Sequence, residues 1–389
     1  MVAALDAVLK KAIENKASAG IVGMAATRNG TFYSGAAGDV SPNGKAPARL
    51  DTVFRIASMT KAITSTAAMQ LVEQGRIGLD QPMGEIAAEL RDVKVLEGFD
   101  SAGKPITRAP KRPVTMRHLL THTSGFSYDI FNANVARYME HEGLPSIATC
   151  LNDSLKAPLL FDPGEGWEYG IGIDWAGKIV EKVSGQDLET YLQANLFKPL
   201  GMKDTSFVLR PDMASRLVDA AARTPDGGIV SFPFEFPQDA DFHMGGGGLF
   251  STAPDYLAYV RMLLNGGELD GRRVLKPETV RLMSENAAGD IEVPAMKSDN
   301  PAMALTAEMF PGQIKRWGLS FIINTEDVPG MRAAGTIAWA GVHNTYYWVD
   351  ATRGVAAVLM MQILPANDPK VIDALVAFEQ AVYANLPKG

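Results

Sequence analysis

The first third of the chain alternates between helical and strand patterns of hydrophobic residues. Residues 1–16 place apolar side chains at helical spacing among charged ones, which predicts an amphipathic surface helix. Two short apolar runs then flank Asn29-Gly30, and because both residues tolerate positive φ, this pair predicts a two-residue hairpin turn. Residues 58–75 have helical composition and are apolar on nearly every side, which predicts a core helix that ends at Gly75.

The C-terminal part of the chain shows strands followed by a helix. Residues 345–364 indicate two strands joined by a turn at Gly354. Asp368-Pro369 then begins a last helix, with the aspartate as its cap and the proline at its first position. Upstream of these strands, residues 286–313 are irregular and predict a long loop.

A helix-rich middle separates these two ends. Residues 81 to about 205 hold helical stretches between loops rich in proline and glycine, with few strand signals. We therefore predict an α/β sheet domain formed by residues 1–80 and 206–389, and a mainly helical domain formed by residues 81–205. A length of 389 residues allows such a composite arrangement.

Composition and charge exclude several classes of protein. The chain is 47% hydrophobic and 21% charged, unlike a disordered or collagen-like chain. Its net charge of −7 repels nucleic acids and anionic membranes, so we expect neither as a partner. Cys150 is the single cysteine, which excludes an intrachain disulfide, and no histidine or cation stands beside it, so we expect a buried, unreactive thiol. Without a long apolar run or a signal-peptide pattern, we expect a cytoplasmic protein with no transmembrane helix.

Two Ser-x-x-Lys motifs are candidates for nucleophilic chemistry, since the Gly-x-Ser-x-Gly signature of α/β-hydrolases is absent. The chemistry requires the serine and lysine on one helical face, one turn apart. Ser101 and Lys104 fall in a loop with glycine and proline and do not meet this requirement. Ser58 and Lys61 begin the predicted core helix, where free N–H groups can bind an oxyanion and burial favours the neutral lysine that a base requires. The motif alone fits equally well a serine cap followed by a solvent-exposed lysine.

Four longer segments of the sequence resemble blocks of one known family. They are FRIASMTKAITSTAAMQLVEQGRIGLDQPM, VTMRHLLTHTSGF, PLLFDPGEGWEYGIGIDWAGKIVEKVSG and GGGGLFSTAPDYLAYVRMLLNGG. The first resembles the active-site helix of the class C β-lactamase and penicillin-binding-protein superfamily. The others resemble blocks of its esterase branch, the family VIII carboxylesterases, and they occur in that family's order.

The resemblance implies both a fold and a site. The fold is α+β and class C β-lactamase-like: an antiparallel sheet flanked by helices plus a helical domain, with the active site at their junction. Ser58 matches the family's nucleophile, Lys61 its partner, and Tyr169 the catalytic tyrosine that accepts the serine proton and passes it to the leaving alcohol. The N–H groups of Ser58 and Val342 would form the oxyanion hole.

The resemblance also shows departures from β-lactamases. Trp339-Ala340-Gly341 stands where β-lactamases have Lys-Thr-Gly and the esterase branch usually has Trp-Gly-Gly. The β-lactamase lysine holds a substrate carboxylate, which a tryptophan cannot do. Ile171 replaces the asparagine that follows the tyrosine by two positions in β-lactamases. Both changes predict an apolar pocket for uncharged esters rather than penicillins. The resemblance also implies that the glycine run 245–248 lies close to the cleft.

A few other residues are candidates for the site. Phe126, Tyr128 and His343 are candidate walls of the substrate pocket, beside the 339–341 run, although aromatic residues are more often core. His118 and His122 are four positions apart, as in zinc proteases. The glutamate of His-Glu-x-x-His is absent between them, so we expect structural packing and no metal.

Together these features predict a serine carboxylesterase that hydrolyses short-chain esters through an acyl-enzyme on Ser58, with water as second substrate and no cofactor. An acyltransferase, or an amidase acting on β-lactams or D-peptides, would use the same site and stays open. A non-catalytic penicillin-binding-protein-like module would usually lack Ser58, Lys61 or Tyr169. The sequence also leaves a homodimer open.

Overall fold

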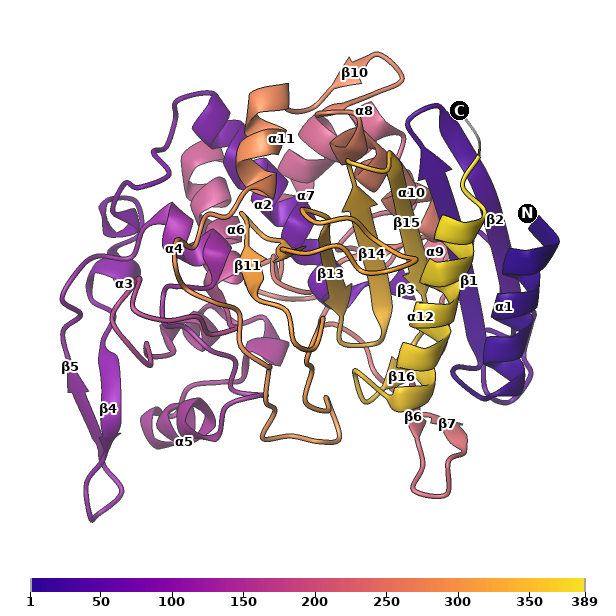
Figure 1. Ribbon diagram of the computed structural model, residues 1–389. Helices are drawn as coiled ribbons and strands as arrows, with labels where there is room; N and C mark the ends of the chain where they lie inside the picture. The colour runs from indigo at the N-terminus through magenta and orange to yellow at the C-terminus, as the bar shows by residue number, and fades with distance from the viewer. Residues whose placement is uncertain (1, 388–389) are drawn as a thin grey trace.

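A sheet made from both ends of the chain forms the centre of the computed structural model, which describes residues 2–387 (Figure 1). Within these residues the sheet has seven strands, and every neighbouring pair is antiparallel. In spatial order they are β11 (Lys315–Trp317), β12 (Ile322–Asn324), β13 (Ile337–Gly341), β14 (Thr345–Asp350), β15 (Val355–Met360), β1 (Gly20–Thr27) and β2 (Gly30–Gly38). Because β1 pairs with β15, the two ends of the chain close one sheet, and the predicted α+β class is confirmed.

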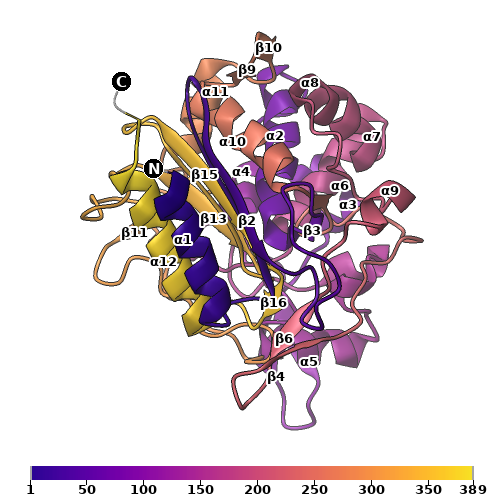
Figure 2. The same cartoon turned by 90° about the vertical axis from the view of Figure 1, so that its right-hand side faces the viewer.

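Helices cover both faces of this sheet. The terminal helices α1 (Val2–Glu14) and α12 (Pro369–Ala384) pack side by side on one face (Figure 2). On the other face α10 (Ala253–Leu264) packs against β1, β14 and β15. Strands covered on both faces have no solvent-facing side, which is why every residue of β14 and β15 is buried and their sequences are almost continuously apolar.

Most of the predicted local elements are present. The first hairpin is confirmed, although its two turn residues are Arg28 and Asn29, between the paired residues Thr27 and Gly30. The last helix begins as predicted: the Asp368 side chain accepts hydrogen bonds from two backbone N–H groups of the first turn, and Pro369 occupies the first position.

The predicted core helix is α2 (Thr60–Glu73), and its first twelve residues are all buried. Its small side chains let neighbouring helices approach closely, and α2 packs against α6 (Gly172–Ser184). After Gln74 the chain reverses at Gly75, whose φ of 69° is the left-handed value that glycine adopts without strain. The buried position of α2 fixes where its N-terminus, with Ser58, can lie.

The remaining elements surround this helix layer. The helical ones are η1 (Ala57–Met59), η2 (Met83–Glu85), α3 (Ala88–Arg91), α4 (Met116–Thr121), α5 (Ala133–Glu142), η3 (Ile147–Thr149), η4 (Asn152–Lys156), α7 (Leu188–Leu192), η5 (Gln193–Phe197), α8 (Lys198–Leu200), α9 (Pro211–Ala214) and α11 (Pro277–Ser284). The short strands are β3 (Phe54–Arg55), β4 (Val95–Phe99), β5 (Pro105–Arg108), β6 (Ala221–Arg223), β7 (Ile229–Ser231), β8 (Phe250–Ser251), β9 (Glu268–Leu269), β10 (Arg272–Arg273) and β16 (Ile363–Leu364). The domain boundaries near residues 81 and 205 stay a prediction. Among the described helices, none combines the length and hydrophobicity that crossing a bilayer requires.

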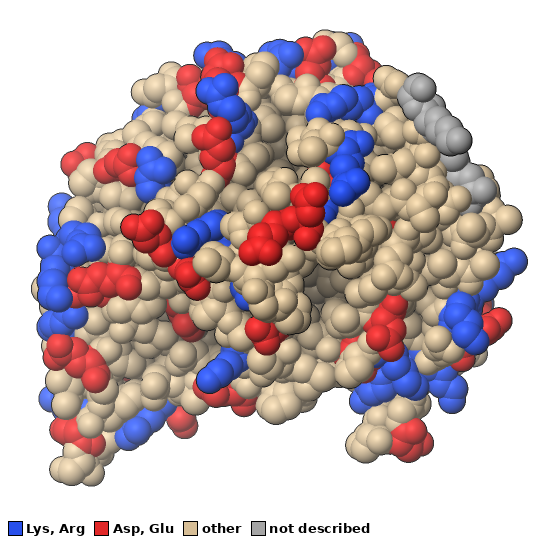
Figure 3. Space-filling view, in the orientation of Figure 1, with Lys and Arg blue, Asp and Glu red and all other residues tan. Residues whose placement is uncertain are grey.

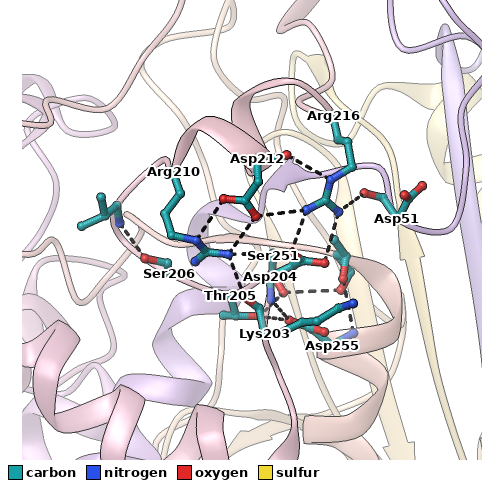
Figure 4. Close-up of polar contacts among 12 residues, drawn as sticks. Asp51, Lys203, Asp204, Thr205, Ser206, Arg210, Asp212, Arg216, Ser251 and Asp255 are labelled. Carbon is teal, nitrogen blue, oxygen red and sulfur yellow. Dashed lines mark hydrogen bonds and ion pairs between the residues drawn. The ribbon is translucent and has the colours of Figure 1, made fainter.

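A cluster of charged residues ties the segment before β3 to the first turn of α10 (Figure 4). Arg216 donates to Asp204 at 2.7 Å and to the Asp51 carbonyl oxygen at 2.8 Å. Asp255 Oδ2 in turn accepts the Asp204 N–H at 2.7 Å and the Thr205 hydroxyl at 3.0 Å. Burial is the largest influence on Asp255 and raises the pKa of its carboxyl from 3.8 to about 6.

Asp255→Asn should change how stability depends on pH. Between pH 4 and 7 the folded wild type retains a proton that the unfolded chain has lost, so wild-type stability should fall as pH rises. The variant lacks this titration, and its stability relative to wild type should therefore improve by roughly 2 kcal/mol over this interval. Denaturant unfolding of both proteins at several pH values measures this. A difference that stays constant from pH 4 to 7 would contradict the assignment.

Candidate active site

Ser58 stands where the chain turns from β3 through η1 into α2. Ala57 has a φ of 44°, a left-handed value that strains any residue with a side chain. The turn is held from the sheet, since Thr345 Oγ1 on β14 donates to the Ile56 carbonyl oxygen at 3.1 Å. Ser58 is left half-buried, and its side chain reaches the wall of a cavity of about 470 Å³.

Lys61 lies one helical turn after Ser58 and is fully buried. Its Nζ atom is 3.1 Å from Ser58 Oγ, 2.8 Å from Tyr128 Oη and 2.6 Å from the Gly246 carbonyl oxygen. The structure therefore brings the predicted nucleophile and its predicted partner within hydrogen-bonding distance. A lysine that reaches solvent, the alternative left open by the motif, is not what the structure shows.

Tyr169 borders the same cavity and contacts Lys61 through its ring rather than through its hydroxyl. Its hydroxyl oxygen accepts a hydrogen bond from Trp339 Nε1 at 3.1 Å. Lys61 Nζ lies 4.7 Å from the centre of the Tyr169 ring, within range of a cation–π contact. The tyrosine whose hydroxyl is hydrogen-bonded to Lys61 is Tyr128, so the part that Tyr169 plays in proton transfer stays a proposal.

Tyr128 was predicted as a pocket wall, and the structure buries it beneath the cavity instead. Its hydroxyl donates to Asp174 Oδ2 at 3.2 Å, and the other oxygen of Asp174 accepts the Gly246 N–H at 2.8 Å. Burial, followed by the nearby Asp174 charge, raises the pKa of Tyr128 well above 10.0, so the phenol stays protonated at neutral pH. Sequence reasoning missed Asp174, although an aspartate inside an otherwise apolar helical stretch is a signal of a buried, partnered carboxylate.

A buried histidine supports Tyr169 from behind. The His122 ring lies 4.8 Å from that of Tyr169 and 5.2 Å from that of Trp317, and its Nδ1 atom accepts the Gly170 N–H at 3.4 Å. Burial, assisted by the positive charge of Lys61, holds the pKa of His122 well below 6.5. His122 is therefore neutral packing, while His118 belongs to a capping box with Thr115 at the start of α4.

The end of β13 forms the wall opposite α2. Trp339, Ala340 and Gly341, together with Val342 just beyond the strand, line the cavity beside Ser58. A Cβ atom on Gly341 would lie 2.3 Å from the Ile56 carbonyl oxygen, so only glycine lets the strand approach the nucleophile turn this closely. This approach is what an oxyanion hole between the two N–H groups needs, and that role of Ser58 and Val342 stays a prediction.

Three residues that sequence reasoning assigned to the pocket do not line it. His343 is buried beside Phe234, at 5.3 Å between ring centres, and burial lowers its pKa to about 3. Phe126 is 1% exposed and belongs to the core. Ile171, also 1% exposed, lies behind the site, so its difference from asparagine does not make the pocket more apolar. Each of the three side chains is therefore part of the core rather than of the pocket wall.

The outer wall of the cavity comes from the long loop predicted at residues 286–313. Its segment 294–309 contributes mainly apolar side chains, including Met296, Leu305 and Met309. Polar groups are fewer; the segment adds Lys297, Ser298 and Asp299, and Glu168 and Asn132 come from elsewhere. Figure 3 shows this face of the molecule hollowed near its centre. The cavity therefore suits a mainly apolar molecule larger than a simple acyl group.

Comparisons with known proteins extend over nearly the whole chain. The Beta-lactamase family model matches residues 5–382. The chain is 33% identical over 397 residues to the lovastatin esterase of Penicillium rubens, covering 97% of this chain and 98% of that protein. It is 35% identical over 356 residues to the monacolin J acid methylbutanoyltransferase of Aspergillus terreus, covering 88% and 84%. The solved structure of unliganded simvastatin synthase (LovD) from Aspergillus terreus is similar with a TM-score of 0.85 and 32% identity, covering 99% of this chain and 98% of that one.

Gly341→Ala should force β13 away from the turn that carries Ser58. The added methyl group would meet backbone and strand atoms that cannot move independently, so we expect a loss of roughly 2–4 kcal/mol of stability and slower reaction of Ser58 with a fluorophosphonate probe. Gly78→Ala is the control, because Gly78 is exposed and an added methyl group would meet only Gln81, with Cβ nearest at 3.2 Å. Equal thermal unfolding midpoints and equal labelling rates in the two variants would refute the close approach.

Proposed function

This chain belongs to the Beta-lactamase family of serine hydrolases, and we propose that it forms an acyl-enzyme on Ser58 from carboxylic esters. The match over residues 5–382 and the likeness to solved structures confirm the class C β-lactamase-like fold that the sequence predicted. The observation that carries the proposal is the 3.1 Å contact between Ser58 Oγ and Lys61 Nζ at the wall of the cavity. It joins an accessible nucleophile to a buried base.

The contacts of Lys61 suit it to the role of base. The Gly246 carbonyl oxygen can only accept a hydrogen bond, and Tyr128 gives its own hydrogen to Asp174. A neutral Lys61 therefore donates its two hydrogens to these acceptors and keeps its lone pair for the Ser58 hydroxyl. As Oγ attacks the ester carbonyl, the proton moves to Nζ, and the rings of Tyr128 and Tyr169, at 5.0 and 4.7 Å, stabilise the ammonium.

Tyr169 is proposed to give its own phenolic proton to the leaving alcohol. Its hydroxyl borders the cavity, where the alcohol departs, and the hydrogen bond from Trp339 Nε1 leaves the phenolic hydrogen free to point at the substrate. Water then takes the place of the alcohol. As it attacks the acyl-enzyme, it gives a proton to the Tyr169 phenolate, and the Lys61 ammonium returns its proton to Ser58 Oγ, so both groups regain their starting forms.

The proposed substrate combines a short acyl group with a larger, apolar alcohol. Trp339 offers no cation for a substrate carboxylate at the position where β-lactamases have one, which favours an uncharged ester. The cavity of about 470 Å³ exceeds what a short acyl group fills. The names of two relatives point the same way, since one transfers a methylbutanoyl group and the other is an esterase of lovastatin.

Ser58→Ala should abolish the hydrolysis of p-nitrophenyl esters while leaving the protein folded. Ser101→Ala is the matched control, because Ser101 belongs to the second Ser-x-x-Lys motif, in the exposed turn between β4 and β5. Initial rates across C2 to C10 esters, with nitrocefin as a β-lactam, test both the nucleophile and the substrate class. We expect the shortest acyl groups to react fastest and nitrocefin to react weakly or not at all. Unchanged ester turnover in Ser58→Ala would refute the assignment.

Acyl transfer to an alcohol is a second candidate function, because a relative that matches 88% of this chain carries a transferase name and the cavity has room for an acceptor. The two activities share the acyl-enzyme and differ in whether water or an alcohol attacks it.

The ratio of transester to free acid measures this balance. With p-nitrophenyl butyrate and rising concentrations of apolar secondary alcohols, a transferase should form ester product that saturates with the alcohol. A product composed only of butyric acid at every alcohol concentration would identify a hydrolase.

A further inference from the structure

We propose that Asp174 is a positioning residue that holds Lys61 in place for Ser58 through two separate arms. One arm is the Tyr128 hydroxyl and the other is the Gly246 peptide group. The inference rests on the proposed function, because it explains how the base of that reaction is aligned. Asp174 itself lies outside the cavity and touches neither Ser58 nor a substrate.

The two arms start from different oxygens of one carboxylate. Asp174 Oδ2 accepts the Tyr128 hydroxyl at 3.2 Å, and Oδ1 accepts the Gly246 N–H at 2.8 Å. Each partner then offers its own oxygen to Lys61 Nζ, Tyr128 at 2.8 Å and Gly246 at 2.6 Å. Asp174 thereby fixes both hydrogen-bond acceptors of Lys61, which leaves the third direction at Nζ for Ser58 Oγ.

Close packing keeps this arrangement rigid. Asp174 lies in the first turn of α6 and is completely buried, as is Lys61 in α2. A Cβ atom on Gly246 would lie 2.3 Å from Asp174 Oδ2 and 2.6 Å from Tyr128 Oη. Glycine at this position is therefore required for the carboxylate, the phenol and the peptide group to meet.

The hydrogen bonds also define the charge of the Asp174 carboxyl group. Both carboxylate oxygens accept a hydrogen, so the ionised form fits the site and a protonated form would leave its own O–H unpaired. Burial raises the pKa of Asp174, but the Lys61 charge and the two hydrogen bonds act against this. When the Ser58 O–H bond breaks and an N–H bond forms on Lys61, the Asp174 charge balances the new ammonium, and Tyr128 keeps its proton.

The other groups around Lys61 do not supply a negative charge in place of the Asp174 carboxylate. Tyr128 and Tyr169 face it with neutral rings, and burial keeps His122 neutral. Among the titratable groups that face Lys61, Asp174 is the anion.

Asp174→Asn tests the proposal with almost no change in shape. The amide would donate to Tyr128, whose hydrogen would then turn to the Lys61 lone pair and compete with Ser58. We expect kcat for p-nitrophenyl butyrate to fall on the order of 100-fold with little change in KM. The acid limb of the kcat/KM profile should move to lower pH, because loss of the Asp174 anion disfavours a positive charge in the site.

Asp255→Asn is the matched control. Asp255 also stands in the first turn of a helix and also accepts one backbone N–H and one hydroxyl, at 2.7 and 3.0 Å, but it belongs to the charged cluster of Figure 4. This variant should keep the wild-type kcat and acid limb. Tyr128→Phe removes one arm while leaving the carboxylate, so it should lower kcat about tenfold, and combining it with Asp174→Asn should lower kcat no further than Asp174→Asn does alone.

The possible results separate the two claims. If the wild type hydrolyses the ester and both Asp174→Asn and Tyr128→Phe retain its kcat and acid limb, the positioning role is overturned and the acyl-enzyme proposal stands. If Asp174→Asn fails to fold, Tyr128→Phe alone tests the positioning role: a fall in kcat supports it, and a wild-type kcat overturns it. If the wild type turns over no ester and Ser58 takes up no fluorophosphonate, the proposed function fails and the positioning role with it.

Discussion

A lysine buried without solvent must find a partner for each polar hydrogen, because unpaired polar groups in a protein interior cost several kcal/mol. Lys61 meets this requirement with two acceptors from separate parts of the chain, the Tyr128 hydroxyl and the Gly246 carbonyl oxygen. The third direction at Nζ is occupied by the nucleophile, Ser58 Oγ, at 3.1 Å. The geometry of the site follows from satisfying this one buried amine.

The fold is arranged so that these groups converge. The buried helix α2 carries Ser58 and Lys61, α6 carries Asp174, and the glycine run after residue 244 passes between them. The central sheet supplies the remaining wall, because β13 ends against the turn that precedes Ser58. Closing the sheet with strands from both ends of the chain holds this edge in a fixed position. Stability and site geometry are therefore products of the same packing.

The catalytic groups and the residues expected to set substrate specificity lie in different parts of the cavity wall. The floor of the cavity is formed by Ser58 and Tyr169, the proposed catalytic groups. Its outer wall is the loop segment 294–309, which belongs to neither the sheet nor the core helices. Loops on a rigid framework can vary without disturbing the catalytic groups. Differences in substrate between members of this family are thus expected in the loop rather than at the floor.

Elements and contacts that depend on near neighbours could be predicted from the sequence. The helical composition of residues 58–75, apolar on nearly every side, predicted the core helix, and the spacing of Ser58 and Lys61 placed them one turn apart, because a helix fixes the distance between positions three apart. The ordered blocks likewise predicted the fold and the cavity positions of Tyr169 and Trp339.

Which distant side chains meet depends on the tertiary structure. It joined Tyr128 to Asp174, 46 positions later, and turned His343, Phe126 and Ile171 into the core, although Val342 lines the cavity directly before His343. A local pattern fixes the spacing of residues along one element, but the direction of a side chain in a turn and the partner it reaches depend on how elements pack against one another. That packing pairs buried polar groups from distant parts of the molecule, and these pairings cannot be predicted from any single segment of the sequence.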